Sequence, residues 1–125
     1  MQSRARSERG SGSLLMVGLM AVIVMMAAAA VCAAGYLVAG RQARAAADLA
    51  ALSGAVAIEQ GGDGCAAARS NASRNRARAV ACERVGDQID FVITVTAEVK
   101  VTAPMRGLPT RVWAVAYAGP AGSGR

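Results

Sequence analysis

Residues 14–39 read LLMVGLMAVIVMMAAAAVCAAGYLVA, a run that contains no charged residue and no proline. At the helical rise of about 1.5 Å per residue, a helix of this length reaches about 39 Å, which exceeds the hydrocarbon core of a bilayer. The core helix of a small soluble protein would keep one polar face for water, and this run has none. The run therefore predicts a single membrane-spanning helix.

The chain around this run is short and basic, with 125 residues and a net charge of +6. We divide it into a basic cytoplasmic leader over 1–13, the transmembrane helix over 14–39, a small extracytoplasmic α+β domain over 40–118 and a tail over 119–125. The composition of the tail predicts disorder. About 85 residues remain to fold in water, which is enough for one domain with a thin core that is marginal without a covalent staple.

Arginines on both flanks of the apolar run bear on its orientation. The leader contains Arg4, Arg6 and Arg9, and the other flank contains Arg41 and Arg44. Membrane helices carry their excess of Lys and Arg on the cytoplasmic side. The balance of three arginines against two favours a single-pass protein of the cell membrane, with a cytoplasmic N-terminus and an extracytoplasmic C-terminal domain.

The three cysteines support this orientation. Cys32 lies inside the apolar run, which leaves Cys65 and Cys82 as a pair in the C-terminal domain. A pair in a small, core-poor domain suggests a disulfide, and disulfides persist outside the cytoplasm. Closing a loop of about 18 residues would stabilise the fold by roughly 3 kcal/mol in the chain-entropy model. The alternative is two unpaired cysteines that act as small apolar residues.

Other segments share the appearance of a membrane anchor. A cleaved secretory signal could be cut near Ala33–Gly35, but its apolar stretch is normally about 7 to 15 residues long. Lipidation at Cys32 is a further alternative. In a pilin-type leader the cut precedes the membrane helix, and Gly10 and Gly12 are the candidates because glycine lets a peptidase take up extended backbone. The alternative for these glycines is a flexible linker.

The residues after the membrane run predict that the helix continues to about Gln60. They are rich in strong helix formers, and Ala45, Leu49, Leu52 and Val56 recur at spacings of three and four, which makes one apolar stripe. A glycine-rich turn over 61–64 then ends the helix. A second helix is expected from Cys65 to about Ala81.

Arginines dominate the exposed surface expected for this second helix, namely Arg69, Arg74, Arg76 and Arg78. Such a set could bind an acidic partner, anionic lipid headgroups or nucleic acid, and the ordinary interpretation is a solvated basic face. Nucleic acid is disfavoured because the domain is expected outside the cell and no aromatic residue for base stacking lies nearby.

The hydrophobic period then changes to two. Apolar and polar residues alternate over 89–102, residues 103–110 contain Pro104, Gly107 and Pro109 and are expected to turn, and 111–118 resumes as a second strand. The predicted fold is therefore α+β and pilin-like. A transmembrane helix continues into a long extracytoplasmic helix, followed by a short helix and a two-stranded antiparallel hairpin whose apolar face covers the helices.

The residue types that carry chemistry are scarce. The chain has no histidine and one lysine, and no serine lies in a nucleophile-elbow sequence. Three cysteines without histidine do not predict a zinc site, particularly with one of them in the membrane. We expect no cofactor, no metal and no enzymatic activity.

With these elements in place, the chain resembles the TadE/TadG-like proteins of Flp-type (tight adherence) pilus systems, in particular a small subgroup from high-GC Gram-positive bacteria. The resemblance covers about residues 8–120. It rests on Glu8–Gly12 before the membrane helix and on Arg41–Ala51 with its central Ala-Ala-Asp-Leu-Ala-Ala sequence. It also rests on the glycine turn before Cys65, on Cys82 ahead of the alternating strand and on Ala-Gly-Pro at 118–120.

The resemblance implies a minor pilin, a pseudopilin or an accessory protein of pilus assembly or secretion. Its partners would be the membrane, other subunits of the pilus or secretion system and a prepilin peptidase, with Gly10 or Gly12 preceding the cut. Two other hypotheses remain: an anchored extracytoplasmic module that binds through its arginine-rich helix, and a small secreted protein with a cleaved signal.

Overall fold

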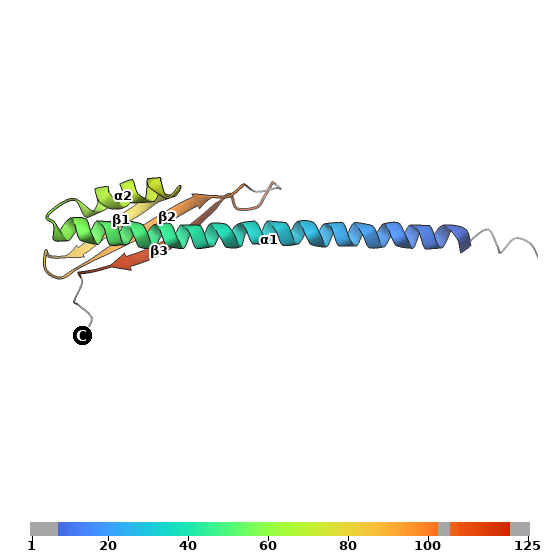
Figure 1. Cartoon of the computed structure of the whole chain (residues 1–125), viewed down its shortest axis with the longest axis horizontal. Coiled ribbons are helices and arrows are strands. Elements are labelled where there is room, and N and C mark those ends of the chain that lie inside the picture. Colours follow the sequence, from blue (N-terminus) through green and yellow to red (C-terminus); the bar gives the residue numbers. More distant parts are fainter. Residues whose placement is uncertain (1–7, 103–105, 121–125) are drawn as a thin grey trace, which may run out of the picture. The chain divides into compact units, whose positions relative to one another are not determined.

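The computed structural model describes residues 8–102 and 106–120, apart from the side chains of Glu8, Arg9 and Ser11. Its elements are α1 (Glu8–Glu59), α2 (Gly64–Arg74), β1 (Arg78–Gly86), β2 (Phe91–Lys100) and β3 (Arg111–Ala118) (Figure 1). The α+β class with a long N-terminal helix is confirmed. The predicted two-stranded hairpin is wrong in one respect, because the described strands form a three-stranded antiparallel sheet in the order β1-β2-β3.

The chain divides into two compact units, one ending at Ala34 and the other beginning at Gly35. In the first unit α1 begins at Glu8, before the expected start at Leu14. Its large aliphatic side chains are exposed, and by length and composition this helix could cross a membrane. The parts of the predicted leader and tail at 1–7 and 121–125 lie outside the described residues.

The core of the second unit forms between one face of α1 and the inner face of the sheet. The buried face of α1 consists almost entirely of small side chains: Ala39, Ala43, Ala46, Ala47, Ala50, Ala51, Ala55 and Ile58. Alternate residues of β2 point toward this face of α1. Phe91, Ile93 and Val95 of β2 are the largest fully buried side chains of the core. The predicted alternation along β2 is confirmed, and Figure 1 shows α2 and the strands alongside the C-terminal part of α1.

Glycines end α1 close to the predicted position. Gly61 adopts a φ of 77°, and its N–H donates to the Ile58 carbonyl at 2.9 Å, while the Gly62 N–H donates to the Ala57 carbonyl at 2.7 Å. Only glycine adopts this left-handed conformation without steric cost, so the helix stops here. The Asp63 carboxylate then accepts the Ala66 N–H at 3.1 Å and caps α2.

The second helix is shorter than predicted, since it ends at Arg74 and not near Ala81. Asn75 forms the C-cap, and its side chain donates to the Asn71 carbonyl at 2.9 Å. Arg76 follows with a φ of 56°, which takes the chain out of the helix. Residues 78–86 then pair with β2, because tertiary pairing outweighs the modest helix propensity of an alanine-rich segment.

The β1–β2 turn also differs from the sequence prediction. Ile89 was expected to begin the alternating strand, but it lies exposed in the turn, and β2 begins at Phe91. Gly86 enters the turn with a φ of 108°, and the Asp87 carboxylate accepts the N–H groups of Ile89 and Asp90, each at 2.8 Å. The N–H of Asp90 and then that of Ile89 hold the pKa of Asp87 below its ordinary value of 3.8.

Asp87 should therefore make the stability of this unit weakly dependent on pH. Because its pKa is lower in the folded state, its contribution is complete above the unfolded value near 3.8 and is lost as the pH falls below it. We expect Asp87→Ala to lower the melting temperature at neutral pH, with a smaller difference from wild type in strong acid. Asp87→Asn keeps an acceptor oxygen that does not titrate, so its melting temperature should approach that of wild type as the pH falls. A difference in melting temperature between Asp87→Asn and wild type that stays the same at every pH would contradict the lowered pKa of Asp87.

Candidate functional site

An exposed apolar surface runs along α1 in the second unit. We call Ala45, Leu49, Leu52 and Val56 the α1 stripe. Its three large side chains are 47%, 58% and 50% exposed, in sequence order. The sequence predicted this stripe, but the structure buries the alanine face of the same helix instead. A helix of a solitary soluble domain would place polar residues here, so the stripe is a candidate surface for contact with another protein.

The four arginines proposed as a binding face are all exposed, but they do not share one helix. Arg69 and Arg74 lie on α2, Arg76 lies in the connection after it, and Arg78 is the first residue of β1. The prediction of a single arginine-rich helical face is therefore wrong. It failed because α2 ends at Arg74 and the chain turns into a strand.

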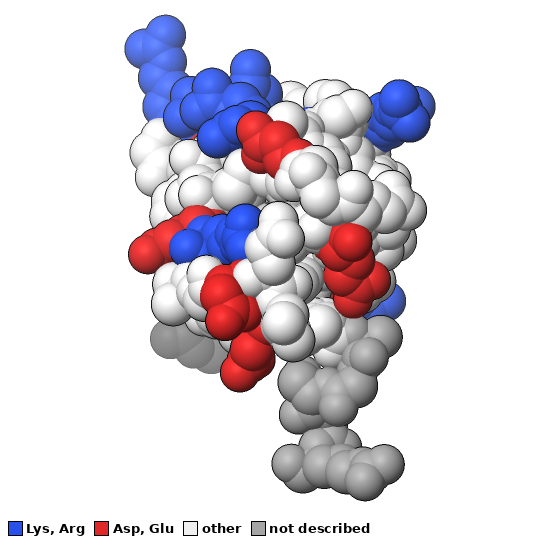
Figure 2. Space-filling model, turned by 90° about the vertical axis from the view of Figure 1, so that its left-hand side faces the viewer, with Lys and Arg blue, Asp and Glu red and all other residues white. Residues whose placement is uncertain are grey.

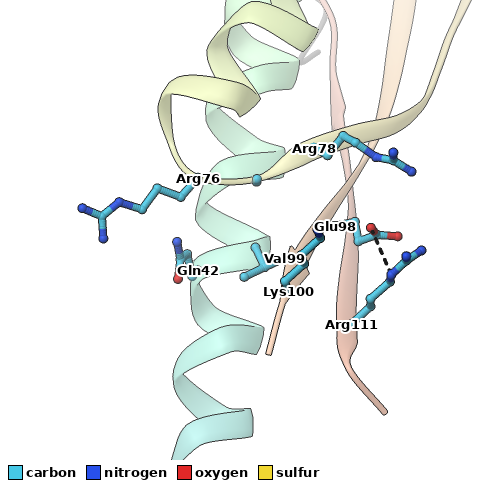
Figure 3. A pocket seen from close by; sticks show the side chains of 8 residues that line it. Gln42, Arg76, Arg78, Glu98, Val99, Lys100 and Arg111 are labelled. Atoms are coloured by element: carbon cyan, nitrogen blue, oxygen red, sulfur yellow. Dashed lines mark ion pairs between the residues drawn. The ribbon is translucent and has the colours of Figure 1, made fainter. Parts of the chain in front are cut away.

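The structure gathers a different set of cations around Gln42 of α1. A hollow of about 480 Å³ is lined by Gln42, Arg76, Ala77, Arg78, Glu98, Val99, Lys100 and Arg111 (Figure 3). A neighbouring hollow adds Arg74 and Asn75, whose carbonyl accepts a bond from the Gln42 amide at 3.4 Å. Arg41 and Arg44 line a third hollow on α1, beside Tyr36. We call these three hollows together the basic end of the unit, with the following cations: Arg41, Arg44, Arg74, Arg76, Arg78, Lys100 and Arg111.

The sheet residues of the basic end were not predicted to lie together, because they are far apart along the chain. The strand register would have identified them, since it places Arg78 opposite Glu98 and Lys100 opposite Arg111. Within the described residues, the ion pair at this end joins Arg111 Nε to Glu98 Oε1 at 3.7 Å. Such a partly exposed pair contributes about 1 kcal/mol or less.

Acidic side chains gather at the opposite end, around the C-terminus of α1 and the β1–β2 turn. They are Glu59, Asp63, Glu83, Asp87 and Asp90, which we call the acidic end. Figure 2 looks onto this end and shows acidic groups spread across it, together with several Lys and Arg side chains, most of them toward the top of the view. Arg84 also lies here, with its guanidinium 5.8 Å from the centre of the Phe91 ring. The two ends of the unit therefore carry opposite charge.

The proposed cysteine pair is joined in the structure. Cys65 in the first turn of α2 and Cys82 on β1 form a disulfide with their Cα atoms 5.7 Å apart. Cys32 is a free cysteine on α1. The bond ties the short helix to the edge strand of the sheet.

The cleavage candidates Gly10 and Gly12 lie in the first part of α1, and a Cβ on either would meet nothing within 4 Å. Both positions are helical, so a peptidase that takes up extended backbone would have to unwind this part of the helix first. Cleavage at either glycine stays a prediction.

Comparisons with protein-family models, with curated proteins and with solved structures found no match. Over the described residues, no three of the side chains that ligate metals come together. The geometry defines an α+β unit attached to a helix that is long and apolar enough to span a membrane, with an apolar stripe and two oppositely charged ends.

Proposed function

We propose that this chain is a membrane-anchored, TadE-like minor pilin, pseudopilin or accessory component of Flp-type pilus assembly or secretion. Its role is structural, and it acts by packing its long helix against the helices of other subunits. The observation that carries the proposal is the exposed α1 stripe. The sequence resemblance supplies the pilus context, and the stripe supplies the physical means of assembly.

The stripe fits a helix partner better than a flat surface. Leu49, Leu52 and Val56 recur at spacings of three and four, the pattern that places side chains along the seam between two helices. Covering about half of each of three aliphatic side chains would contribute a few kcal/mol to association. A plain anchor gains nothing from leaving these side chains in water.

The proposal places the N-terminus in the cytoplasm and the α+β unit outside. The Cys65–Cys82 disulfide supports this orientation, because such bonds persist outside the reducing cytoplasm. The balance of flanking arginines points the same way. A binding module built on an arginine-rich helix is less favoured, because α2 carries only two of the four arginines.

Cross-linking through the stripe tests the proposal directly. In a Cys32→Ala background, we expect treatment of native membranes with a bismaleimide to link Leu52→Cys covalently to a second copy of the chain or to a different subunit. Arg69→Cys, an exposed position on α2, is the matched control and should remain monomeric. Equal adduct formation at both positions, or none at Leu52→Cys, would remove the basis for assembly through this face.

A polar stripe should prevent assembly without unfolding the unit. We expect Leu49→Gln combined with Leu52→Gln to abolish recovery of the protein in high-mass complexes from membranes and sheared surface material. The melting temperature should change little, because both side chains lie outside the core. Normal complex formation by this variant would contradict the proposal.

The mature N-terminus separates the remaining alternatives, and intact mass measures it. A start at Ser11 or Ser13 would support pilin-type processing. An uncut chain would favour an accessory role in the membrane, whereas a start between Ala33 and Val38 would identify a secreted protein and rule out the anchored component.

A further inference from the structure

A hydrogen bond connects the β2–β3 loop to the last apolar residues of α1. The Tyr36 hydroxyl donates to the Pro109 carbonyl at 2.6 Å, and the Val101 N–H donates to the Thr110 carbonyl at 2.8 Å, which closes the base of the loop. Tyr36 belongs to the apolar run that ends at Ala39. Tyrosine is enriched at the level of lipid headgroups, where its ring is in apolar surroundings and its hydroxyl is hydrogen-bonded.

The basic end lies just beyond this level on the same part of α1. The cations of the basic end lie around Gln42. At a rise of about 1.5 Å per residue, Gln42 lies about 9 Å beyond Tyr36 along the helix. The headgroup layer is about 5 to 8 Å thick on each side of the hydrocarbon core. Arg41 and Arg44 are exposed at the same height. When Tyr36 marks the inner edge of the headgroup layer, these cations therefore lie at its outer edge, within reach of lipid phosphates.

We propose that the basic end docks on the anionic phospholipid headgroups of the membrane that holds α1, with Tyr36 at the interface. This inference does not rest on the pilus function. Arginine and lysine bind phosphate oxygens through charge-assisted hydrogen bonds, and a juxtamembrane set of cations is attracted to an anionic bilayer.

The charges of the second unit support this docking in two ways. Among the described residues, Arg111 forms an ion pair with Glu98, whereas most other cations of the basic end have no carboxylate partner. Five of the seven carboxylates in the described part of the unit lie at the acidic end, where they would be kept away from an anionic surface; Asp48 and Glu98 are the other two. The charge distribution of the unit therefore favours an orientation in which the basic end faces the anionic membrane and the acidic end points away from it.

The acidic end of a second copy is the other complementary partner. Lipid is favoured because the basic end is the end at which α1 enters the unit, so the headgroups around that helix are the nearest anionic groups. A second copy would have to insert its acidic end between the unit and the bilayer.

The single tryptophan reports on this docking in the full-length protein. Trp113 is 64% exposed and lies opposite Glu98 in the sheet, at the basic end. In vesicles of phosphatidylcholine with about 30% phosphatidylglycerol, we expect acrylamide quenching of Trp113 to fall about twofold relative to phosphatidylcholine alone. Salt at about 0.5 M should restore quenching, because it shortens the screening length to a few ångströms.

Substitutions then locate the contact. Arg76→Glu should reduce the lipid-dependent protection, and Arg76→Glu with Lys100→Glu should remove it. Arg69→Glu makes the same charge change on α2 outside the basic end and should leave protection intact. Equal quenching in both lipids, or an equal effect of Arg69→Glu and Arg76→Glu, would overturn the proposal. Protection that is independent of lipid charge and rises with protein density would assign the surface to a second copy and overturn it as well.

Discussion

Replacing Cys65 and Cys82 by alanine is expected to lower the free energy of unfolding of the α+β unit by about 3 kcal/mol. The bond joins residues separated by 17 positions, and in the chain-entropy model a loop of that size contributes about this amount. The effect is large because the core is thin. Within the described residues, only Phe91, Ile93 and Val95 are large and fully buried, and alanines make up most of the remaining core.

The measurement is chemical denaturation of the full-length protein in detergent, followed by Trp113 fluorescence. Trp113 lies on β3, so its signal follows the sheet and not the first unit. Cys32→Ala is the control, and it should leave the transition unchanged because Cys32 lies in the first unit. A Cys65→Ala/Cys82→Ala variant with the stability of wild type would show that the bond does not support the unit.

The same bond bears on orientation. If the unit lies outside the cytoplasm, as proposed, Cys65 and Cys82 should resist alkylation in intact cells until a reductant is added. Reduction alone should then reproduce the loss of stability of the double-alanine variant. A fully alkylated pair without reductant would count against both the bond and the orientation.

The parts of the fold that the sequence predicted correctly depend on local signals. An apolar run without charge predicts the first part of α1, which is long and apolar enough to cross a membrane. Gly61 ends α1 because only glycine adopts its backbone conformation readily. Alternation along residues 91–100 identifies β2, since one face of that strand is buried under α1. In each case neighbouring residues contain enough information to choose the structure.

Strand β1 was not predictable in this way. Residues 77–82 are Ala-Arg-Ala-Val-Ala-Cys, which favour a helix by propensity. They become a strand because Arg76 leaves the helix and because β2 offers a pairing edge, which is a contact between distant residues. The irregular register between Ala79 and Ala81 also breaks the alternation that would have marked this segment as a strand.

The α1 stripe and the basic end differ in how far they could be predicted from the sequence. Spacing of three and four identified the α1 stripe, but the alanines of the same helix recur with similar spacing, so periodicity could not show which face is buried. The basic end depends on strand register, which brings Lys100 beside Arg111. Small side chains decide the buried face of α1, because α2 and β2 approach that helix too closely for larger ones.

Gly54→Ala tests this close approach and is the second large effect that we expect. A Cβ at Gly54 would lie 2.6 Å from Ile93 Cδ1 and 2.9 Å from the Gly64 carbonyl oxygen. Ile93 is fully buried, and the carbonyl belongs to the start of α2, so neither can move without disturbing the core. We expect a loss of about 1–3 kcal/mol from overpacking, against a gain of about 1 kcal/mol from the better helix propensity of alanine.

Gly40→Ala is the matched control on the same helix, because a Cβ at Gly40 meets nothing within 4 Å. There the helix propensity acts alone, so stability should be unchanged or raised by up to about 1 kcal/mol. The net expectation for Gly54→Ala is a loss of up to about 2 kcal/mol, so Gly54→Ala should lower the denaturation midpoint of Trp113 fluorescence relative to Gly40→Ala. If Gly54→Ala stabilised the unit as Gly40→Ala does, α1, α2 and β2 could not meet as closely as the structure has them. The alanine face would then have no packing reason to be preferred over the stripe.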